Sequence, residues 1–217
     1  MAHAAFPAPS DTAVTGVAMT EAPVARIGPN TIIQLAQVLR DHYGESVAAR
    51  LLVSSTGYAL GALPGAMVDE REAQAFVRAV MRELGERPGA RLLHEAGRRT
   101  ADYLMAHRIP RPAQWLMRWL PRRAGLRLLL EAMRANAWTF AGSGRFTVST
   151  SRHGAQLTFH DCAMCRDMVA GQPVCSFYAG TFARLIRTLV TPHAAVREVE
   201  CQALGGRCCR FEVTGIS

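Results

Sequence analysis

The chain has 217 residues, 49% of them hydrophobic, which is enough for one compact domain with its own core and argues against intrinsic disorder of the whole chain. Its 25 basic residues are all arginine and outnumber the 17 acidic ones. The resulting net charge of +8 favours an anionic partner, a class that includes nucleic acid, membrane headgroups and acidic small molecules.

Residues 1–26 are rich in Ala, Pro, Thr and Ser and lack a periodic apolar pattern, which predicts a disordered tail before a single domain over 27–217. No uninterrupted apolar run reaches the roughly 18 residues of a membrane-spanning helix. Residues 1–16 also lack the basic-then-apolar order of a secretory signal. We therefore expect a cytoplasmic protein, in which six cysteines indicate metal ligands or buried thiols rather than disulfides.

The first half of the domain shows helical spacing of apolar residues. Asp69 followed by Glu72 has the spacing of a helix N-cap with an acid in the first turn, and Pro110 and Pro112 end the helix before them. The pattern predicts successive helices within residues 26–44, 45–61, 72–85 and 89–108.

Residues 112–140 are amphipathic, which predicts two helices that meet near Pro121. Trp115 and Trp119 begin an apolar stripe that continues through several leucines, with arginines between its members. Such a stripe most often faces a core. A second interpretation places it on a membrane surface, with the arginines at the headgroups.

The periodicity changes to two after Gly144, where alternating residues on both sides of His153–Gly154 predict a hairpin. A helical segment follows at 175–190, and alternation around Gly205–Gly206 predicts a closing hairpin with a two-residue turn. The order β-β-α-β-β after several helices predicts an α+β fold, in which N-terminal helices pack on an antiparallel sheet.

All six cysteines lie in this last part, at positions 162, 165, 175, 201, 208 and 209. Cys162 and Cys165 have the spacing in which two thiols can reach one metal, but no second C-x-x-C pair accompanies them. Gly142-x-Gly144 precedes a strand and opens no helix, so it lacks the context of a dinucleotide-binding loop. We find no convincing nicotinamide or flavin site, and an iron–sulfur centre is less favoured because a clear four-cysteine set is missing.

Residues 26–44 together with "EVECQALGGRCCRFEV" at 198–213 resemble the 4-vinyl reductase domain family of the bacteriochlorophyll pathway, which also includes the ligand sensors of phenol-responsive transcription activators. The resemblance covers most of the chain from residue 27. It implies an α+β fold, a homodimer and an apolar small-molecule pocket. It also implies a structural zinc ion within the β-rich part at about 144–217, held by Cys175, Glu198, Cys201 and Cys209.

Alternation along a strand sends Glu198 and Cys201 to opposite faces, so both can bind one metal only if a bulge or bend lies between them. Cys162, Cys165 and Cys208 are additional donors, one of which could replace Glu198. The competing interpretation of these three is that they are small buried hydrophobic residues.

The family implies reduction of the 8-vinyl group of a chlorophyll precursor, but the residues support binding more readily than reduction. The function that we expect is binding of a magnesium tetrapyrrole of the chlorophyllide or protochlorophyllide type and its presentation to other pathway enzymes, at the inner face of the photosynthetic membrane. The alternatives are the 8-vinyl reductase itself and a ligand-sensing or tethering module. Nucleic-acid binding is least favoured, since the arginines are scattered and no recognition motif accompanies them.

Such a ligand is flat and apolar, with a carboxylate edge and a central magnesium ion. An arginine can hold the carboxylate through two parallel hydrogen bonds, and a histidine can supply an axial nitrogen. For each of these residues an ordinary surface or core role is the competing interpretation. The candidates are Arg98, Arg99, Arg122 and Arg123 for the carboxylate, His94 ahead of His107 and His160 for the magnesium, and Trp115 and Trp119 for the ring.

Overall fold

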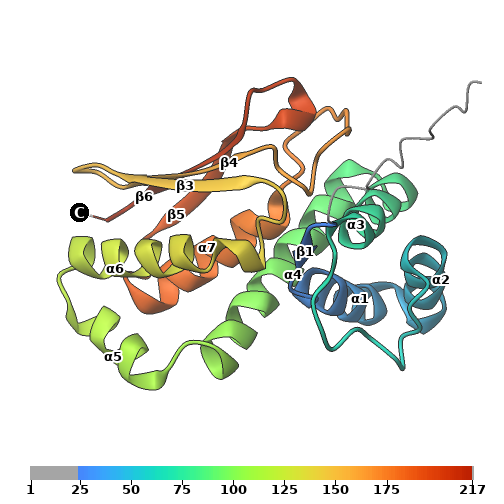
Figure 1. Ribbon diagram of the computed structural model, residues 1–217, viewed down its shortest axis with the longest axis horizontal. Helices are drawn as coiled ribbons and strands as arrows, with labels where there is room; N and C mark the ends of the chain where they lie inside the picture. The colour runs from blue at the N-terminus through green and yellow to red at the C-terminus, as the bar shows by residue number, and fades with distance from the viewer. Residues whose placement is uncertain (1–23, 217) are drawn as a thin grey trace, which may run out of the picture.

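The structure is a computed structural model that describes residues 24–216 (Figure 1). The predicted tail at 1–26 lies outside the described residues as far as residue 23. The helices are α1 (Asn30–Tyr43), α2 (Glu45–Thr56), α3 (Glu70–Leu84), α4 (Glu86–His107), α5 (Arg111–Trp119), α6 (Arg122–Ala135) and α7 (Ser176–Leu189). The strands are β1 (Arg26–Ile27), β2 (Val68–Asp69), β3 (Arg145–Thr150), β4 (Ala155–His160), β5 (Ala195–Glu200) and β6 (Cys209–Thr214), and two short 3₁₀ helices are η1 (Ala137–Thr139) and η2 (Gln202–Leu204).

Four strands form one antiparallel sheet in the order β3-β4-β6-β5, and β1 pairs with β2 in a separate two-stranded ribbon. Helix α7 packs between this sheet and the long helix α4, and α6 lies beside α7 under the same face (Figure 1). Helices α1 to α3 gather around the other part of α4. The predicted α+β class and the order β-β-α-β-β are both confirmed.

Aromatic side chains fill the space between the sheet and α7. Phe159 of β4 stacks on Tyr178 of α7 with ring centroids 4.4 Å apart, and Phe211 of β6 meets Phe182 of α7 edge to face at 5.5 Å. The Tyr178 hydroxyl donates a hydrogen bond to the Phe140 carbonyl at 2.8 Å. Such ring pairs add about 0.5–1.5 kcal/mol each beyond the burial of their area. The layer is therefore a packed core that fixes α7 on the sheet.

Glycine allows α4 and α7 to cross at backbone contact. A Cβ atom on Gly97 would stand 2.0 Å from the Phe177 carbonyl oxygen, and one on Gly180 would stand 2.1 Å from the His94 carbonyl oxygen. At the same crossing the Thr181 hydroxyl donates to the Gly97 carbonyl at 3.1 Å. The two helices therefore approach more closely than any pair with side chains at these positions could.

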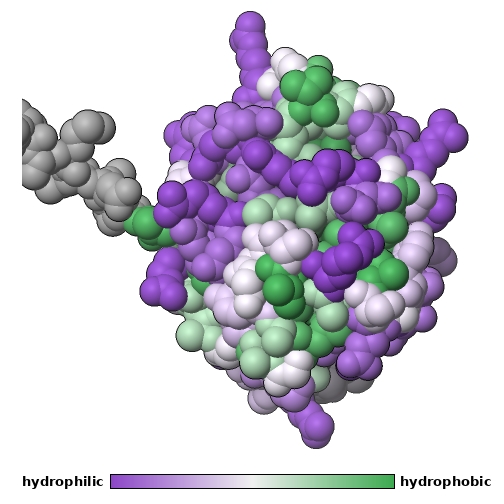
Figure 2. All heavy atoms as spheres, turned by 90° about the vertical axis from the view of Figure 1, so that its right-hand side faces the viewer, coloured by the Kyte–Doolittle hydropathy of each residue, from purple (hydrophilic) through white to green (hydrophobic). Residues whose placement is uncertain are grey.

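The helix boundaries follow the expected signals with one exception. Helix α1 stops at Gly44 as expected, and Asp69 caps α3 by accepting a hydrogen bond from the Arg71 backbone N–H at 2.8 Å. The predicted helix at 45–61 is too long, since α2 ends at Thr56 and Gly57 adopts the left-handed φ of 77°. The chain then runs as a loop to β2; on this side of the molecule, apolar side chains are interspersed with polar ones (Figure 2).

Helices α5 and α6 meet at Pro121 as expected and form one end of the molecule (Figure 1). The core interpretation of their apolar stripe holds for Met117 and for the α6 residues Leu126, Leu129, Leu130 and Met133, which are buried. It does not hold for Trp115 and Trp119, whose side chains are 61% and 73% exposed. None of the described helices is both long enough and apolar enough to cross a membrane.

Candidate metal centre

Three segments bring cysteines together beneath one end of the sheet. Cys162 and Cys165 lie in the turns after β4, Cys175 occupies the N-cap of α7, and Cys201 and Cys209 flank the connection from β5 to β6. All five are buried.

The connection from β5 to β6 differs from the expected tight turn. Residues 201–208 form it, with η2 inside and Gly205 at a left-handed φ of 81°. A Cβ on Gly206 would stand 2.8 Å from the Cys201 carbonyl oxygen. The prediction of a two-residue Gly205–Gly206 turn was therefore wrong, because these glycines close a wider loop that brings Cys201 near Cys209.

A bulge resolves the conflict over Glu198. In the ladder with β6, Glu198 pairs with Phe211 and Glu200 pairs with Arg210, so Val199 is left without a partner. Val199 is 40% exposed, whereas the Glu198 side chain turns inward. One extra residue reverses the alternation beyond it. Glu198 and Cys201 therefore reach the same side of the strand, as binding to one metal requires.

The four residues implied by the resemblance form a compact group of donors. One ligand atom each from Cys175, Glu198, Cys201 and Cys209 lies within 4.8 Å of all the others. The Cys175 and Cys209 sulfurs are 3.6 Å apart, and the Cys175 backbone N–H donates to Glu198 Oε2 at 3.0 Å. The Gln202 backbone N–H donates to the Cys209 sulfur at 3.4 Å, as it would to a thiolate.

A second group of four donors overlaps the first. The sulfurs of Cys162, Cys165, Cys175 and Cys209 also lie within 4.8 Å of one another. Cys162 stands 3.7 Å from Cys175, and Cys165 stands 3.2 Å from Cys209, measured between sulfurs. Cys208 is buried but belongs to neither group. Of the three cysteines left open by the sequence, two therefore join the centre and one does not.

The donors fit a divalent metal ion. Four sulfurs at the zinc–sulfur distance of about 2.3 Å in a tetrahedron stand roughly 3.8 Å apart, close to the distances in this centre. Glu198 Oε1 is buried and has no hydrogen-bond partner in the structure. Burial, and then the negative charge of the Cys201 thiolate, raise the pKa of Glu198 to about 10. A buried carboxyl oxygen with no partner is costly, and a cation would supply one.

A buried carboxylate that the sequence did not indicate anchors the C-x-x-C segment. Glu70 Oε2 accepts from the Ser143 backbone N–H at 2.7 Å, and Glu70 Oε1 accepts from the Ser143 hydroxyl at 2.7 Å and from Arg166 Nη1 at 3.0 Å. The Arg166 carbonyl in turn accepts from Gln74 Nε2 at 2.6 Å and from Arg78. The only sequence signal was Gly142-Ser143-Gly144, whose function is thus to receive Glu70 rather than a phosphate.

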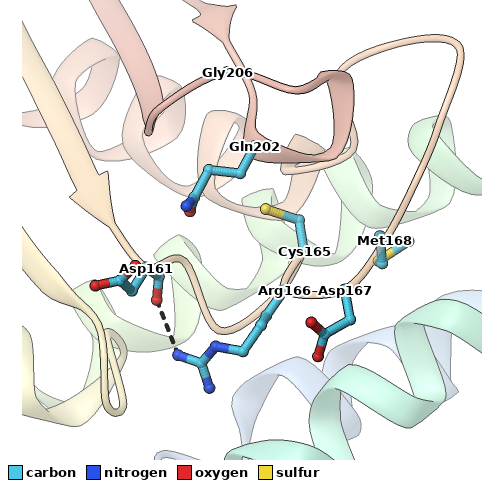
Figure 3. Close-up of a pocket in the computed structure, with 7 residues that line it drawn as sticks. All are labelled: Asp161, Cys165, Arg166, Asp167, Met168, Gln202 and Gly206. Carbon is cyan, nitrogen blue, oxygen red and sulfur yellow. Dashed lines mark hydrogen bonds between the residues drawn. The ribbon is translucent and has the colours of Figure 1, made fainter.

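A polar hollow of about 360 Å³ opens beside Cys165 (Figure 3). It is lined by Asp161, Cys165, Arg166, Asp167, Met168, Gln202 and Gly206. In Figure 3 the Cys165 sulfur points toward Gln202, and Arg166 reaches the Asp161 carbonyl at 3.1 Å. Tetrapyrrole sites are mostly apolar, so this hollow serves the metal centre rather than a macrocycle.

The candidate ligand-binding residues lie on two helical regions. His94 and Arg98 are on α4 near Arg187 of α7, and burial, followed by the charges of Arg98 and Arg187, lowers the pKa of His94. Arg99 turns toward α1, where it pairs with Asp41 at 2.6 Å and also with Glu95.

The remaining candidates are on α5 and α6. The rings of Trp115 and Trp119 are 5.2 Å apart and exposed. Arg122 and Arg123 begin α6 and are also exposed.

The fold and the cysteine centre define a protein with a vinyl-4-reductase domain. The family model for this domain matches residues 156–214, which run from β4 through α7 to the end of β6 and include every donor of the centre. The predicted resemblance is thereby confirmed.

Two longer relatives identify the family more narrowly. The chain is 41% identical over 192 residues to the bacteriochlorophyll synthase 23 kDa chain of Cereibacter sphaeroides, covering 87% of this chain and 90% of the relative. It is 38% identical over 187 residues to the protein of the same name from Rhodobacter capsulatus, covering 86% and 85%. The chain belongs to the family of the bacteriochlorophyll synthase 23 kDa chain.

Solved structures with the same fold come from H-NOX proteins. A mutant H-NOX of T. tengcongensis matches with a TM-score of 0.53 and 14% identity, covering 87% of this chain and 97% of the other. An H-NOX protein studied for heme distortion matches with a TM-score of 0.53 and 15% identity, covering 87% and 94%. At this identity the likeness concerns the fold alone.

Proposed function

We propose that this protein takes part in bacteriochlorophyll biosynthesis. There it binds a magnesium tetrapyrrole of the chlorophyllide or protochlorophyllide type and presents it to other pathway enzymes around the 8-vinyl reduction step. The observation that carries the proposal is the identity of 41% and 38% to two bacteriochlorophyll synthase 23 kDa chains over most of their length. The fold supports it, since an H-NOX protein of the same fold was studied for distortion of its heme, which is also a tetrapyrrole.

The face of α5 and α6 offers the chemistry that such a ligand requires. Trp115 and Trp119 expose two adjacent indole rings, on which a flat macrocycle can stack, and Arg123 provides a charged partner for a carboxylate nearby in the sequence. The interior between α7 and the sheet is already filled by aromatic rings. The exposed face is therefore the better candidate surface. His94, Arg98 and Arg99 on α4, and Arg122 on α6, complete the proposed set.

The proposed zinc ion has a structural role. Cys175, Glu198, Cys201 and Cys209 would hold it, and a site with four protein ligands is closed to substrate. It would join the start of α7 to the ends of β5 and β6, so its binding energy would contribute to folding. We further propose that the protein is a homodimer and contacts the membrane peripherally.

The test is a titration of the purified protein with divinyl and monovinyl precursors, with and without reductants, followed by absorption spectra and product analysis. We expect a shifted tetrapyrrole spectrum without conversion of the vinyl group. Replacing both Trp115 and Trp119 with Ala should weaken binding at least tenfold, whereas Trp138→Ala, which removes another exposed indole, should leave it unchanged.

The same titration examines the alternative that the family resemblance raises, the 8-vinyl reductase itself. Reduction of a vinyl group needs electrons from a cofactor that the enzyme holds and orients. Repeated conversion of divinyl to monovinyl product with only a nicotinamide or ferredoxin donor would replace the carrier with the enzyme. No spectral change with any precursor would remove both.

A further inference from the structure

Six buried donors surround the cysteine centre, more than one tetrahedral ion can use. They form two groups of four, and the groups share Cys175 and Cys209. Cys162 and Cys165 complete one group, and Glu198 and Cys201 complete the other. Two tetrahedra that share an edge have this composition, with six ligands for two metals.

We infer that the centre holds two divalent metal ions, bridged by the thiolates of Cys175 and Cys209. One ion has the further ligands Cys162 and Cys165, and the other has Glu198 and Cys201. The inference rests on the structural zinc proposed above, to which it adds a second, all-thiolate site.

Distances around the shared pair support a bridge. The Cys175 and Cys209 sulfurs are 3.6 Å apart, and each has a near neighbour from the C-x-x-C turn, at 3.7 Å for Cys162 and 3.2 Å for Cys165. The sulfurs thus form a chain from Cys162 through the shared pair to Cys165. Two unbonded sulfurs as close as 3.2 Å require either a shared hydrogen or a shared cation, and a cation serves the whole chain at once.

The segment that carries Cys162 and Cys165 is constrained on both sides. Asp161 and Asp167 adopt left-handed φ angles of 55° and 57°, which residues other than glycine adopt at a cost. The Cys162 backbone N–H donates to Gln202 Oε1 at 2.6 Å, next in sequence to the ligand Cys201. The Glu70–Arg166 pair fixes the other end. Strain at two residues, maintained by contacts from three elements, directs both thiols inward, which simple burial of two small side chains does not need.

Charge favours two ions over one. Five thiolates and a carboxylate carry six negative charges when all bind metal, and two divalent ions offset four of them. A single ion would offset two, and leaving the others ionised in a buried site is costly. Cys175 also occupies the N-cap of α7, where the helix dipole stabilises negative charge.

The second site has a route from solvent. Cys165 lines the hollow of about 360 Å³, whose rim carries the exposed carboxyl groups of Asp161 and Asp167 (Figure 3). Carboxylates at an entrance attract cations. We therefore expect the all-thiolate ion to exchange faster than the ion bound by Glu198.

The test counts metals in the full chain. Reduced apoprotein is reconstituted anaerobically with excess Zn²⁺, desalted and measured for zinc per chain. We expect two ions in the wild type and in Cys208→Ser, whose thiol lies outside both groups, and one ion in Cys162→Ser and in Cys165→Ser. One zinc in the wild type that Cys162→Ser retains and Cys201→Ser loses would overturn the second site and keep the first. No zinc in the wild type would overturn both.

A measurement on the wild type alone avoids dependence on the folding of variants. With ¹¹³Cd in place of zinc, two resonances are expected, one for four thiolates and one for three thiolates with a carboxylate, coupled through the shared sulfurs. A single resonance at saturation would contradict the bridge. A disulfide between Cys165 and Cys209 in the protein purified without oxidant would also contradict it.

Discussion

At the scale of single residues, the bulge at Val199 decides which groups meet at the metal centre. It turns Glu198 and Cys201 to one side, and the Glu198 oxygen without a partner then needs a cation. Cys208, next to the ligand Cys209, points away from both donor groups. Adjacent residues in a strand point to opposite faces, so only one of the pair can serve.

Replacing Cys201 with Ser should therefore remove the zinc of the Glu198 site and destabilise the protein, because a structural site contributes its binding energy to folding. A loss of roughly 3 kcal/mol would lower the thermal midpoint by about 6–12 °C. Zinc analysis and calorimetry measure the two effects. Cys208→Ser removes a buried thiol from the same loop and is the control, with its full zinc content retained. Full zinc in both Cys201→Ser and Cys209→Ser would disprove the assignment.

Glu70 is the second residue on which the centre depends. It is 6% exposed and binds both Ser143 and Arg166. Glu70→Ala should lower the free energy of unfolding by roughly 3 kcal/mol, because it leaves Arg166 without its ion-pair partner. Urea unfolding measures the loss.

Glu83→Ala is the matched control for Glu70→Ala, since Glu83 also lies on α3. Its ion pair with Arg50 is exposed and 3.6 Å long, so its removal should cost under about 1 kcal/mol. Equal losses in the two variants would show that Glu70 does not anchor the C-x-x-C segment.

At the scale of elements, the crossing of α4 and α7 joins the N-terminal helices to the layer that carries the metal centre. Backbone contact at Gly97 and Gly180 is possible only without a Cβ atom. Gly180→Ala should destabilise the protein by roughly 1–3 kcal/mol, because its methyl group would force the helices apart. Gly65→Ala is the control, since its Cβ would meet no atom within 4 Å. Stability unchanged by Gly180→Ala would mean that the helices cross at a greater distance.

Element types were predictable where one periodicity extends over a whole segment. The apolar spacing in α1 and in α7, and the alternation in β3 and β4, each reflect one buried face, so the sequence carries the signal. The closing connection was not predictable in the same way. Two adjacent glycines suit a tight turn, but here they permit a close approach to the Cys201 carbonyl, which depends on contacts outside the strand pair.

The composition of the metal centre was predictable only in part, for a related reason. Cys175, Glu198, Cys201 and Cys209 came from resemblance, and the bulge that unites them appears in no residue pattern. The contribution of Cys162 and Cys165 depends on Glu70, which lies 92 residues before Cys162 in the chain and meets their loop only after folding. Interactions between residues so distant in sequence have no local signature.

At the scale of the whole molecule, positive charge and exposed indoles gather at the α5–α6 end. Residues 111–134 contain six arginines and one acid, and Trp115 and Trp119 are the most exposed apolar side chains of α5. Tryptophan suits the boundary between headgroups and acyl chains, and arginine suits anionic headgroups. We expect this end to bind vesicles of anionic lipid, with an affinity that falls as salt rises, since exposed charges are screened over about 8 Å at physiological ionic strength.

Charge variants test whether that binding belongs to this end of the molecule. Replacing Arg123 and Arg127 with Gln should weaken vesicle binding roughly 30-fold, at about 1 kcal/mol for each arginine near the surface. The same change at Arg82 and Arg87, exposed on α3 and α4, removes equal charge from another region and should have much less effect. Co-sedimentation with vesicles measures both. Equal weakening in the two double variants would mean that net charge alone attracts the protein, and salt-independent absence of binding would leave the tryptophans free for the tetrapyrrole.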